Sequence, residues 1–508
     1  MLRNSSSHAH RAGGASCVAL IAAAGLFVMA ALPAQAQNLR GSFSPGGGEA
    51  STGALLPLVQ GATPGEAAAE ADPAPSNNAP APARAPSTDD VTTATVRETT
   101  VDEADEERNV AAKRESLRAP PIEGRTLPAE ENPFAPTGIR VGSFVIRPTL
   151  QQGIEYTTNA AGLAGGGSDV LSETTLRLNA QSDWSRHSAT LDAFGTYRTS
   201  LRGTGFHEFI GGVDAAARFD IGKSFELKTA LGYNRRPEEA TSPVGLPATT
   251  SRPLRQTITG KAGLEKAIGP LRFGVTGAIA RNTYGSADLV GGGVLSQADR
   301  NQTLYTAKLR GGYEVSPALL PFIELEAGRR NYDLRLDSNG YARSANRLGA
   351  RAGVEFDRGE KLNGEIAAGI ISENFDDARL GSLSAFAIDG AVNWSPMRGT
   401  TVTLTGSTEI EGTTTAGESG SVLYATSLGI SRQIRAQLTA DAVLGASFRR
   451  YATTGDSDRT LSAEARLTYW LNRYAGLTGR ARHEATTSSI AGRGSRTTSV
   501  FLGLTMQR

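Results

Sequence analysis

The dominant pattern in the chain is a strict alternation of apolar and polar residues. Over residues 345–356, Leu348 and Val354 occupy positions that alternate with those of Arg347 and Arg351. A period of two places one set on each face of a β-strand. After a short turn the same alternation resumes, so this stretch predicts a β-hairpin with one apolar face and one charged or bare face. A single hairpin of this kind would also suit a soluble β-sandwich. The number of times the pattern is repeated along the chain decides between a sandwich and a membrane barrel.

The alternation continues from residue 139 to the end of the chain and predicts about eighteen strands of roughly ten or more residues. That length crosses a bilayer when the strand is tilted. Short connections such as 357–360 and 395–399 alternate with long ones such as 235–253 and 283–302. The pattern is typical of a transmembrane up-and-down antiparallel β-barrel with short periplasmic turns and long outer loops. We expect an all-β domain over residues 136–508 with about 18 strands, the alternative being 16.

Aromatic residues support a membrane barrel, because all Tyr and Trp residues follow Ala135. Many fall on the apolar face near strand ends, where two belts of amphipathic rings are expected at the lipid headgroup levels. One group lies near the short turns: Trp184, Phe219, Phe225, Phe273, Tyr313, Phe356 and Trp394. The other lies near the long loops: Tyr156, Tyr197, Tyr233, Tyr305 and Tyr424.

The opposite face of the predicted strands carries charges of both signs. We expect these residues to line the lumen: Arg177, Asp192, Arg198, Asp214, Arg218, Glu226, Lys228, Lys308, Arg310, Glu324, Glu326, Arg347, Arg351, Glu355, Glu365, Glu409, Asp441, Glu464, Arg466, Arg480 and Arg482. Barrels of about 16 to 18 strands are wide enough for an aqueous channel. The alternative is that many of the charges pair across strands while a loop or the N-terminal region plugs the lumen. The balance of signs leaves ion selectivity open.

Residues 1–36 resemble an export signal. A basic start precedes the apolar segment 17–32, and Ala34-Gln35-Ala36 provides a small-x-small cleavage pattern. The alternative is a retained anchor helix. Cys17 is the only cysteine and would leave with the signal, so the mature chain would have no disulfide or thiolate ligand.

Residues 37–135 are rich in Ala, Pro, Ser and Gly and nearly devoid of aromatic residues. Such a segment cannot bury enough apolar surface to offset its chain entropy, so we expect a disordered periplasmic region. Within it, residues 101–118 combine good helix formers with early acidic and late basic residues. They predict a short helix, either a partner-binding element or a transient solvated helix.

Composition and chemistry exclude several function classes. A formal net charge of +1 gives no reason to expect nucleic-acid binding. His187, His207 and His483 are isolated from one another, and metal-ligand spacings, phosphate-binding motifs and nucleophile elbows are absent from the sequence. We therefore expect no enzyme activity, no metal and no cofactor.

The segment 132–159 carries a family resemblance through its GIRVGSF motif, its Arg147-Pro148 step and its closing Asn159. It resembles the start of the putative β-barrel porin type 2 family of Gram-negative outer-membrane proteins, and the similarity covers about residues 133–508. The resemblance implies an outer-membrane barrel for transport or for passage of surface polysaccharide, and it supplies no catalytic residues. The chain ends in Arg508 without the terminal aromatic usual in such barrels, so recognition by the barrel-assembly machinery rests on Phe501 or is weaker.

Two functions remain open at this point. The first is a porin-like channel for passive passage of small hydrophilic solutes across the bacterial outer membrane. The second is a non-conducting or gated barrel that serves as an accessory of surface-polysaccharide export. The expected partners are outer-membrane lipid, the barrel-assembly machinery and, through the N-terminal region in the periplasm, envelope or polysaccharide-export proteins.

Overall fold

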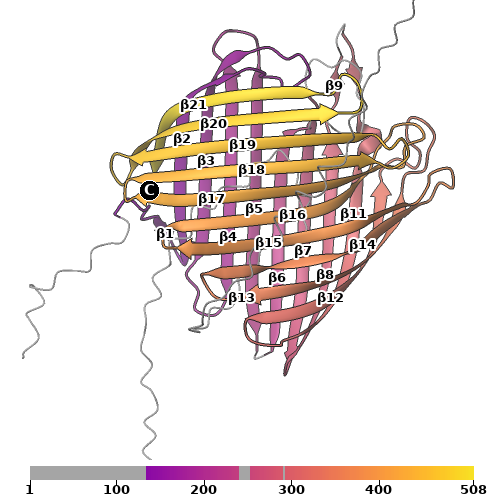
Figure 1. The fold of residues 1–508 in the computed structure, drawn as a ribbon, viewed down its shortest axis with the longest axis horizontal. Helices are drawn as coiled ribbons and strands as arrows, with labels where there is room; N and C mark the ends of the chain where they lie inside the picture. Colours follow the sequence, from indigo (N-terminus) through magenta and orange to yellow (C-terminus); the bar gives the residue numbers. More distant parts are fainter. Residues whose placement is uncertain (1–132, 223, 239–251, 290–291) are drawn as a thin grey trace, which may run out of the picture.

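The alternating segments form one closed antiparallel sheet (Figure 1). The computed structural model describes residues 133–222, 224–238, 252–289 and 292–508. The predicted signal, the predicted disordered region and the predicted helix at 101–118 lie outside these residues. In the described residues the sheet has 19 strands, of which β1 is a three-residue edge strand and the other 18 close the barrel. The predicted fold class and the strand number of 18 are confirmed.

The bounds of the elements follow the sequence alternation closely. In chain order they are β1 (Ile139–Val141), β2 (Phe144–Thr157), β3 (Asp169–Ser182), β4 (Ser188–Ser200), β5 (His207–Ile221), β6 (Phe225–Pro237), β7 (Leu254–Ile268), β8 (Leu271–Tyr284), β9 (Ala287–Asp288), β10 (Val294–Leu295), the 3-10 helix η2 (Ala298–Arg300), β11 (Gln302–Tyr313), β12 (Leu319–Tyr332), β13 (Ala345–Asp357), β14 (Leu362–Phe375), β15 (Leu383–Met397), β16 (Thr400–Glu411), β17 (Ser421–Arg435), β18 (Leu438–Tyr451), β19 (Ser457–Trp470), β20 (Ala475–Ser488) and β21 (Ser495–Gln507).

The barrel closes where β2 pairs with β21, from Thr149↔Gln507 to Thr157↔Ser499. Gly153 and Gly503 face each other in this register, and a Cβ on either would collide with the Phe501 ring. Glycine at both positions therefore lets Phe501 lie across the closing strands. Phe501 is fully buried on the inner face of the sheet.

Short and long connections alternate as the sequence predicts. β7 and β8 are joined by two residues, whereas β6 and β7 are separated by residues 238–253. We call the two ends of the barrel the turn end and the loop end. The long connection between β8 and β11 contains the β9–β10 hairpin and η2.

The outer face of the barrel is apolar and exposed. Leu502, Leu231 and Ile323 are 69%, 67% and 62% exposed, which would be costly in water but suits contact with lipid. Most of the predicted belt aromatics lie on this exposed face: Tyr156, Trp184, Tyr197, Phe225, Tyr233, Phe273, Tyr305, Tyr313 and Trp394. Tyr424 differs from the expectation, since it packs against an internal apolar cluster near the loop end.

No helix among the described residues has the length and apolar character needed to cross a membrane.

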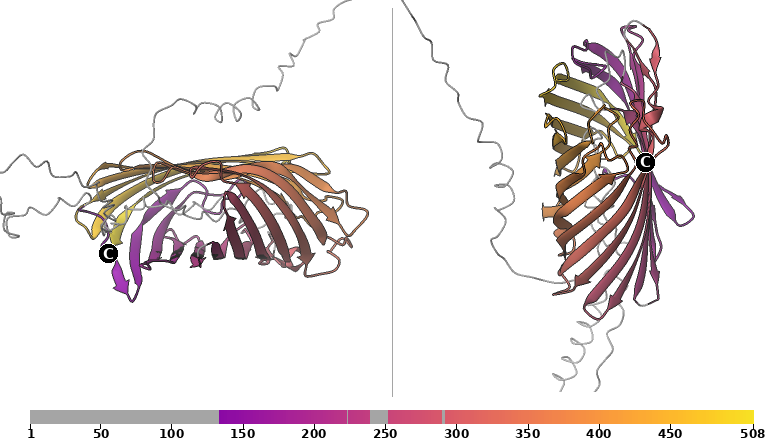
Figure 2. Two further views of the ribbon diagram at one scale, coloured as in Figure 1. Left: turned by 90° about the horizontal axis from the view of Figure 1, so that it is seen from below. Right: turned by 90° about the vertical axis from the view of Figure 1, so that its right-hand side faces the viewer.

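The barrel is flattened rather than round (Figure 2). Strands β14 to β21 form most of one wall, and β3 to β8 form most of the other, with the strands of the two walls crossing in projection (Figure 1). The sheet therefore turns sharply between the walls, near β11 to β13, and this curvature positions the inner side chains described next.

Candidate functional site

The charged inner face of the sheet is the candidate site. Arg480 on β20 forms an ion pair of 2.7 Å with Glu173 on β3, although β21 and β2 lie between those strands. Side chains can meet over two intervening strands only on the concave side of a curved sheet. Each residue predicted to line the lumen lies on this side of its strand, opposite the exposed apolar residues.

A second sharp bend of the sheet lies between β11 and β14. Arg310 on β11 contacts Glu324 on β12 at 2.9 Å and Glu365 on β14 at 2.8 Å. Neighbouring strands are about 4.8 Å apart, so three spacings of a flat sheet would span roughly 14 Å. The contact between Arg310 and Glu365 is therefore possible because the sheet bends sharply here.

Glu326 is the centre of the same charged cluster. Its carboxylate contacts Arg347 at 2.6 Å, Arg351 at 2.7 Å and Lys308 at 3.6 Å. Arg351 also reaches Asp389 on β15 at 2.9 Å. Several cations thus share Glu326, and ion pairs link the strands from β11 to β15 on the inner face, a region that we call the paired sector.

Arg330 and Glu373 form the most buried pair of the paired sector. Their side chains are 1% and 0% exposed, and Arg330 donates from Nε and Nη2 to the two oxygens of Glu373 at 3.1 and 2.8 Å. Arg330 also donates to Gln302 Oε1 at 2.8 Å and to the carbonyl of Ile410 at 2.9 Å. A buried pair with its remaining donors satisfied holds neighbouring strands in place.

A second group of ion pairs surrounds the closure of the barrel. Arg480 contacts Glu155 at 3.6 Å in addition to Glu173, and Arg198 contacts Glu155 at 3.7 Å and also Glu208. Near them, Arg466 pairs with Glu464 at 3.2 Å and Arg482 with Glu484 at 2.6 Å. Glu155, Glu173 and Glu373 were not among the predicted lining residues, although their alternation places them on the same face.

The wall from β3 to β6, which we call the open sector, has fewer ion pairs. Asp192 and Asp214 lie directly opposite each other in the β4–β5 register. Asp192 accepts a hydrogen bond of 2.7 Å from Asn179, whereas the exposed Asp214 carboxylate makes no hydrogen bond or ion pair within the described ranges. Arg177 lies 5.8 Å from the centre of the Phe194 ring.

The other predicted lining residues have individual environments. Lys228 contacts Glu265 at 2.9 Å and Glu226 at 3.3 Å, and Arg218 lies opposite Lys228 in the β5–β6 register. Glu355 of β13 is exposed and lies opposite Glu365 in the β13–β14 register. The remaining two are Asp441, which accepts a 2.7 Å hydrogen bond from Ser431, and Glu409, which is buried.

The loops above the paired sector interlock at the loop end. Arg343 donates to Asp337 at 2.7 Å and to the carbonyl of Thr415 at 2.7 Å, which joins the β12–β13 loop to the β16–β17 loop. Asn339 donates to the carbonyl of Thr414 at 2.8 Å. In the adjoining β14–β15 loop, Arg379 holds the pKa of the Asp377 carboxyl well below its usual range through side-chain hydrogen bonds. These loops pack over one part of the mouth.

Another part of the mouth is hollow. A polar cavity of about 520 Å³ lies between the β2–β3 and β20–β21 loops. Its lining includes Asn159, Gly166, Thr487, Ser495 and Arg496. The loop end is therefore packed above the paired sector and indented beside the closing strands.

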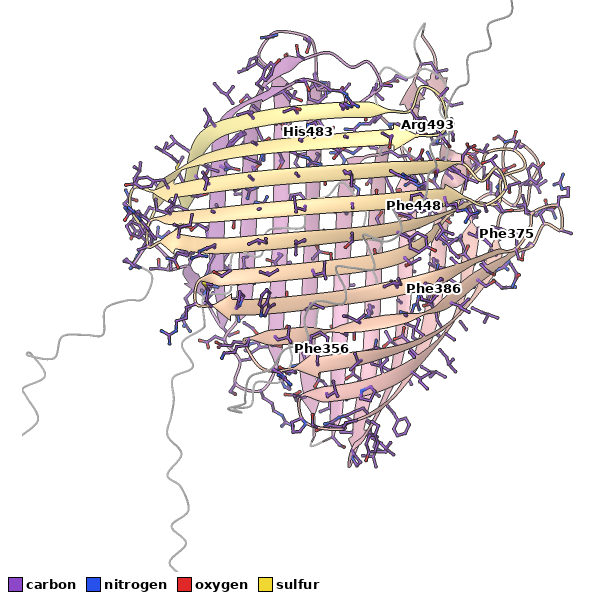
Figure 3. All side chains as sticks on the ribbon, in the orientation of Figure 1. Phe356, Phe375, Phe386, Phe448, His483 and Arg493 are labelled. Carbon is purple, nitrogen blue, oxygen red and sulfur yellow. The ribbon has the colours of Figure 1, made fainter. Side chains whose placement is uncertain are left out.

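The three histidines considered as catalytic candidates are far from one another in the fold. His187 accepts a hydrogen bond of 3.2 Å from the Asp220 amide, and His207 is exposed at the start of β5. His483 lies on the exposed face of β20 (Figure 3). Its ring forms a hydrogen bond of 2.8 Å with the Thr498 hydroxyl. In the part of the chain that the structure describes, no group of three or more His, Cys, Asp or Glu side chains is arranged to hold a metal ion.

Comparisons with known proteins bear on the family. A family model described as putative beta-barrel porin 2 matches residues 132–508. Among curated proteins, the sequence matches none.

Solved structures that match include the outer membrane protein opdK from Pseudomonas aeruginosa, with 11% identity and a TM-score of 0.34 over 72% of this chain and 99% of that chain. The FrpB iron transporter from Neisseria meningitidis has 8% identity and a TM-score of 0.33 over 73% of this chain and 83% of that chain. OccAB3 from Acinetobacter baumannii has 12% identity and a TM-score of 0.34 over 72% of this chain and 100% of that chain.

Proposed function

Because the chain belongs to the putative β-barrel porin 2 family of outer-membrane barrels, we propose that it is a channel for passive passage of small hydrophilic solutes. The observation that carries this proposal is a closed barrel of 18 strands whose outer face is apolar and whose inner face is charged. A barrel of that size leaves room for water inside. The exposed inner carboxylate of Asp214 supports a hydrated interior, since an unpaired charge in a dry interior would be very costly.

The residues predicted to line the lumen divide into two roles under this proposal. Those of the open sector, including Asp192 and Asp214, face the permeating water and ions. Those of the paired sector, including Glu326 and Arg351, stabilise the curved wall and narrow the lumen. Ion selectivity then follows from the open sector rather than from the total charge of the inner face.

The position of the first described residues supports a periplasmic location for the N-terminal region. Arg473, in the turn between β19 and β20, donates to the carbonyl of Pro133 at 3.0 Å. Gln507 donates to the carbonyl of Phe134 at 2.8 Å. The chain therefore enters the barrel at the turn end, and short turns face the periplasm in barrels of this class. The partners that we propose for this placement are outer-membrane lipid and the barrel-assembly machinery.

Planar-bilayer recording of the purified full-length protein tests the channel proposal. The expected result is stepwise conductance that scales with salt concentration. Absence of steps, in protein shown by its resistance to protease to be folded, would contradict it. The necessary control is that the purified protein, in detergent and with its lipid retained, resists protease.

A second candidate function, a gated accessory of surface-polysaccharide export, is favoured by the interlocked loops at the mouth. Arg343 and Asn339 bind the β16–β17 loop over the paired sector. For this candidate, the full-length protein should be silent and deletion of residues 37–130 should produce conductance. Equal conductance before and after the deletion would favour the simple channel.

A further inference from the structure

The barrel wall separates between β15 and β16 near the loop end. The two strands pair from Met397↔Thr400 to Gly390↔Gly406, where their pairing stops. β15 continues to Leu383 while paired with β14, and β16 continues to Glu411 while paired with β17. β15 and β16 are consecutive in the sequence, yet near the loop end they no longer form backbone hydrogen bonds with each other, although both remain strands.

Side chains replace the backbone bonds where the separation begins. The Thr408 hydroxyl accepts a hydrogen bond of 2.8 Å from the Ile388 amide and donates one of 3.0 Å to the Ile388 carbonyl. The Thr408 amide donates to the Asp389 carboxylate at 3.2 Å. The Ile388 amide and carbonyl and the Thr408 amide are thus satisfied without a β ladder, which lowers the cost of separating the strands here.

Beyond that point the loop-end parts of β16 and β17 lie inside the barrel. Ile410 of β16 and Val422 of β17 pack with Ile371, Leu383 and Ala387, which are on the inner face of β14 and β15. Ile410 is 1% exposed and Ala387 is 0% exposed, so the contact is dry.

Further apolar residues complete this internal contact. Phe375, at the loop end of β14 in Figure 3, packs against it together with Tyr424. A cluster of apolar side chains on the inner face is unusual in a barrel whose inner face carries many charged residues.

The sequence of β16 and β17 also suits the barrel wall. If the β15–β16 register continued, Ile388 would face Thr408 and Phe386 would face Ile410. Ile410 would then lie on the outer surface beside Phe386, which is 56% exposed on the visible wall in Figure 3. Ile410 and Val422 follow the alternation of lipid-facing residues, yet in this structure they are covered by β14 and β15. The same residues can therefore be buried in either of two positions.

We propose that the loop-end parts of β16 and β17, with the loop 412–420 between them, form a gate. This structure shows the gate in the closed position. The proposal rests on the channel function proposed above. In the closed position Arg330 holds the Ile410 carbonyl at 2.9 Å, and Arg343 and Asn339 hold the loop. In the open position β16 pairs with β15 along its whole length, the inner apolar contact is lost, and the mouth widens.

Gly412 offers a substitution that acts on the closed position alone. A Cβ at Gly412 would collide with the Tyr332 hydroxyl of β12, so Gly412→Ala should displace the gate. Gly406→Ala is the matched control, because the nearest atom to its Cβ is 4.0 Å away on the same wall. Tyr332→Phe combined with Gly412→Ala removes the colliding hydroxyl and should restore closure.

Single-channel recording of the full-length variants gives the readout. We expect Gly412→Ala to raise conductance or open probability several-fold, Gly406→Ala to match the parent protein, and the double variant to return towards it. Equal behaviour of Gly412→Ala and Gly406→Ala would overturn the gate. Each substitution adds one methyl group or removes one hydroxyl group, and protease resistance verifies that each variant is folded.

Cysteine pairs provide a test that does not depend on conductance. Phe386→Cys with Ile410→Cys should form a disulfide in isolated outer membranes only when the gate visits the open register, and Ala387→Cys with Ile410→Cys should capture the closed position. Cys17, in the predicted signal, is the only other cysteine of the sequence. Formation of both disulfides supports two positions of the gate. If only the cysteines at positions 387 and 410 form a disulfide, the gate is fixed in the closed position. If both disulfides form but no variant conducts ions, the gate moves between two positions and the channel proposal fails.

Discussion

The paired sector and the open sector use the same residue types for different purposes. In the paired sector, Glu326 is shared by three cations and its side chain is 2% exposed. In the open sector, Asp214 is exposed, and the residue opposite it is another aspartate. Charge on the inner face of a barrel therefore does not by itself indicate contact with permeating solute. The local curvature of the sheet decides whether a charge is a structural contact or a lining group.

Curvature explains the difference physically. Between β11 and β14 the sheet bends so sharply that Arg310 reaches Glu365 over two intervening strands. Side chains crowd together in such a bend, and the most buried charges, such as those of Arg330 and Glu373, must be paired because an unpaired buried charge is very costly. Along a flatter wall, side chains diverge into the lumen and water can solvate them individually.

The largest effect is expected from breaking the deepest pair of the paired sector. Glu373→Ala leaves the Arg330 guanidinium buried without its main acceptor and should lower the free energy of unfolding by about 3–5 kcal/mol. Urea unfolding in lipid vesicles, monitored by tryptophan fluorescence, measures this change. Asp214→Asn is the matched control in the open sector. A loss below about 1 kcal/mol for Glu373→Ala would contradict the structural role of the pair.

An intermediate effect on permeation, with little effect on stability, is expected in the open sector. Asp192→Asn with Asp214→Asn removes two carboxylates from the lining and should lower the ratio of cation to anion permeability by roughly two-fold or more. Reversal potentials in a salt gradient measure the ratio, and the difference should shrink near 1 M salt because the charges are screened.

A matched variant in the paired sector sharpens this comparison. Glu326→Gln should weaken the fold while changing selectivity less, because its charge is surrounded by cations. If Glu326→Gln changed the permeability ratio more than the Asp192 and Asp214 substitutions did, the division into two sectors would be wrong.

The smallest effect is expected from an exposed pair at the loop end. Asp333, in the loop after β12, forms a pair with Arg281 in which both side chains are about one-third exposed. Its hydrogen bonds with Arg281 lower the pKa of Asp333 below its ordinary value, so the pair stabilises the fold at neutral pH. That contribution is lost as the pH falls through the lowered pKa.

Asp333→Asn should therefore cost less than about 1 kcal/mol at neutral pH and nothing at strongly acidic pH. Urea unfolding of the parent protein and the variant at both pH values measures the difference. A cost that stayed constant between the two pH values would contradict an ionic origin.

The sequence was sufficient to predict the strands, their faces and the alternation of turns and loops. Each of these depends on a period of two and on local turn residues, which a sequence displays directly. The inner position of Glu155, Glu173 and Glu373 could also have been found by extending the same alternation.

The separation of β15 and β16 could not be predicted in this way. Thr408, Ile410 and Val422 have the alternation of an ordinary wall strand, so their sequence gives no sign that they lie inside the barrel. Their position depends on contacts with Arg330 and with the apolar inner face of β14 and β15, which are distant in sequence. The pairing of Arg310 with Glu365 likewise depends on curvature, a property of the closed sheet rather than of any single strand.

Accessibility of the two faces of one strand tests the central claim most directly. Nitroxide labels placed singly at residues 257–264 of β7, in protein reconstituted in lipid vesicles, report collisions with oxygen from the lipid and with a nickel chelate from water. We expect the two accessibilities to alternate out of phase, with oxygen highest at Ile258 and Leu264 and nickel highest at Thr257, Thr259 and Lys261. Low access of both probes at the inner positions would reveal a dry interior and would contradict a water-filled channel.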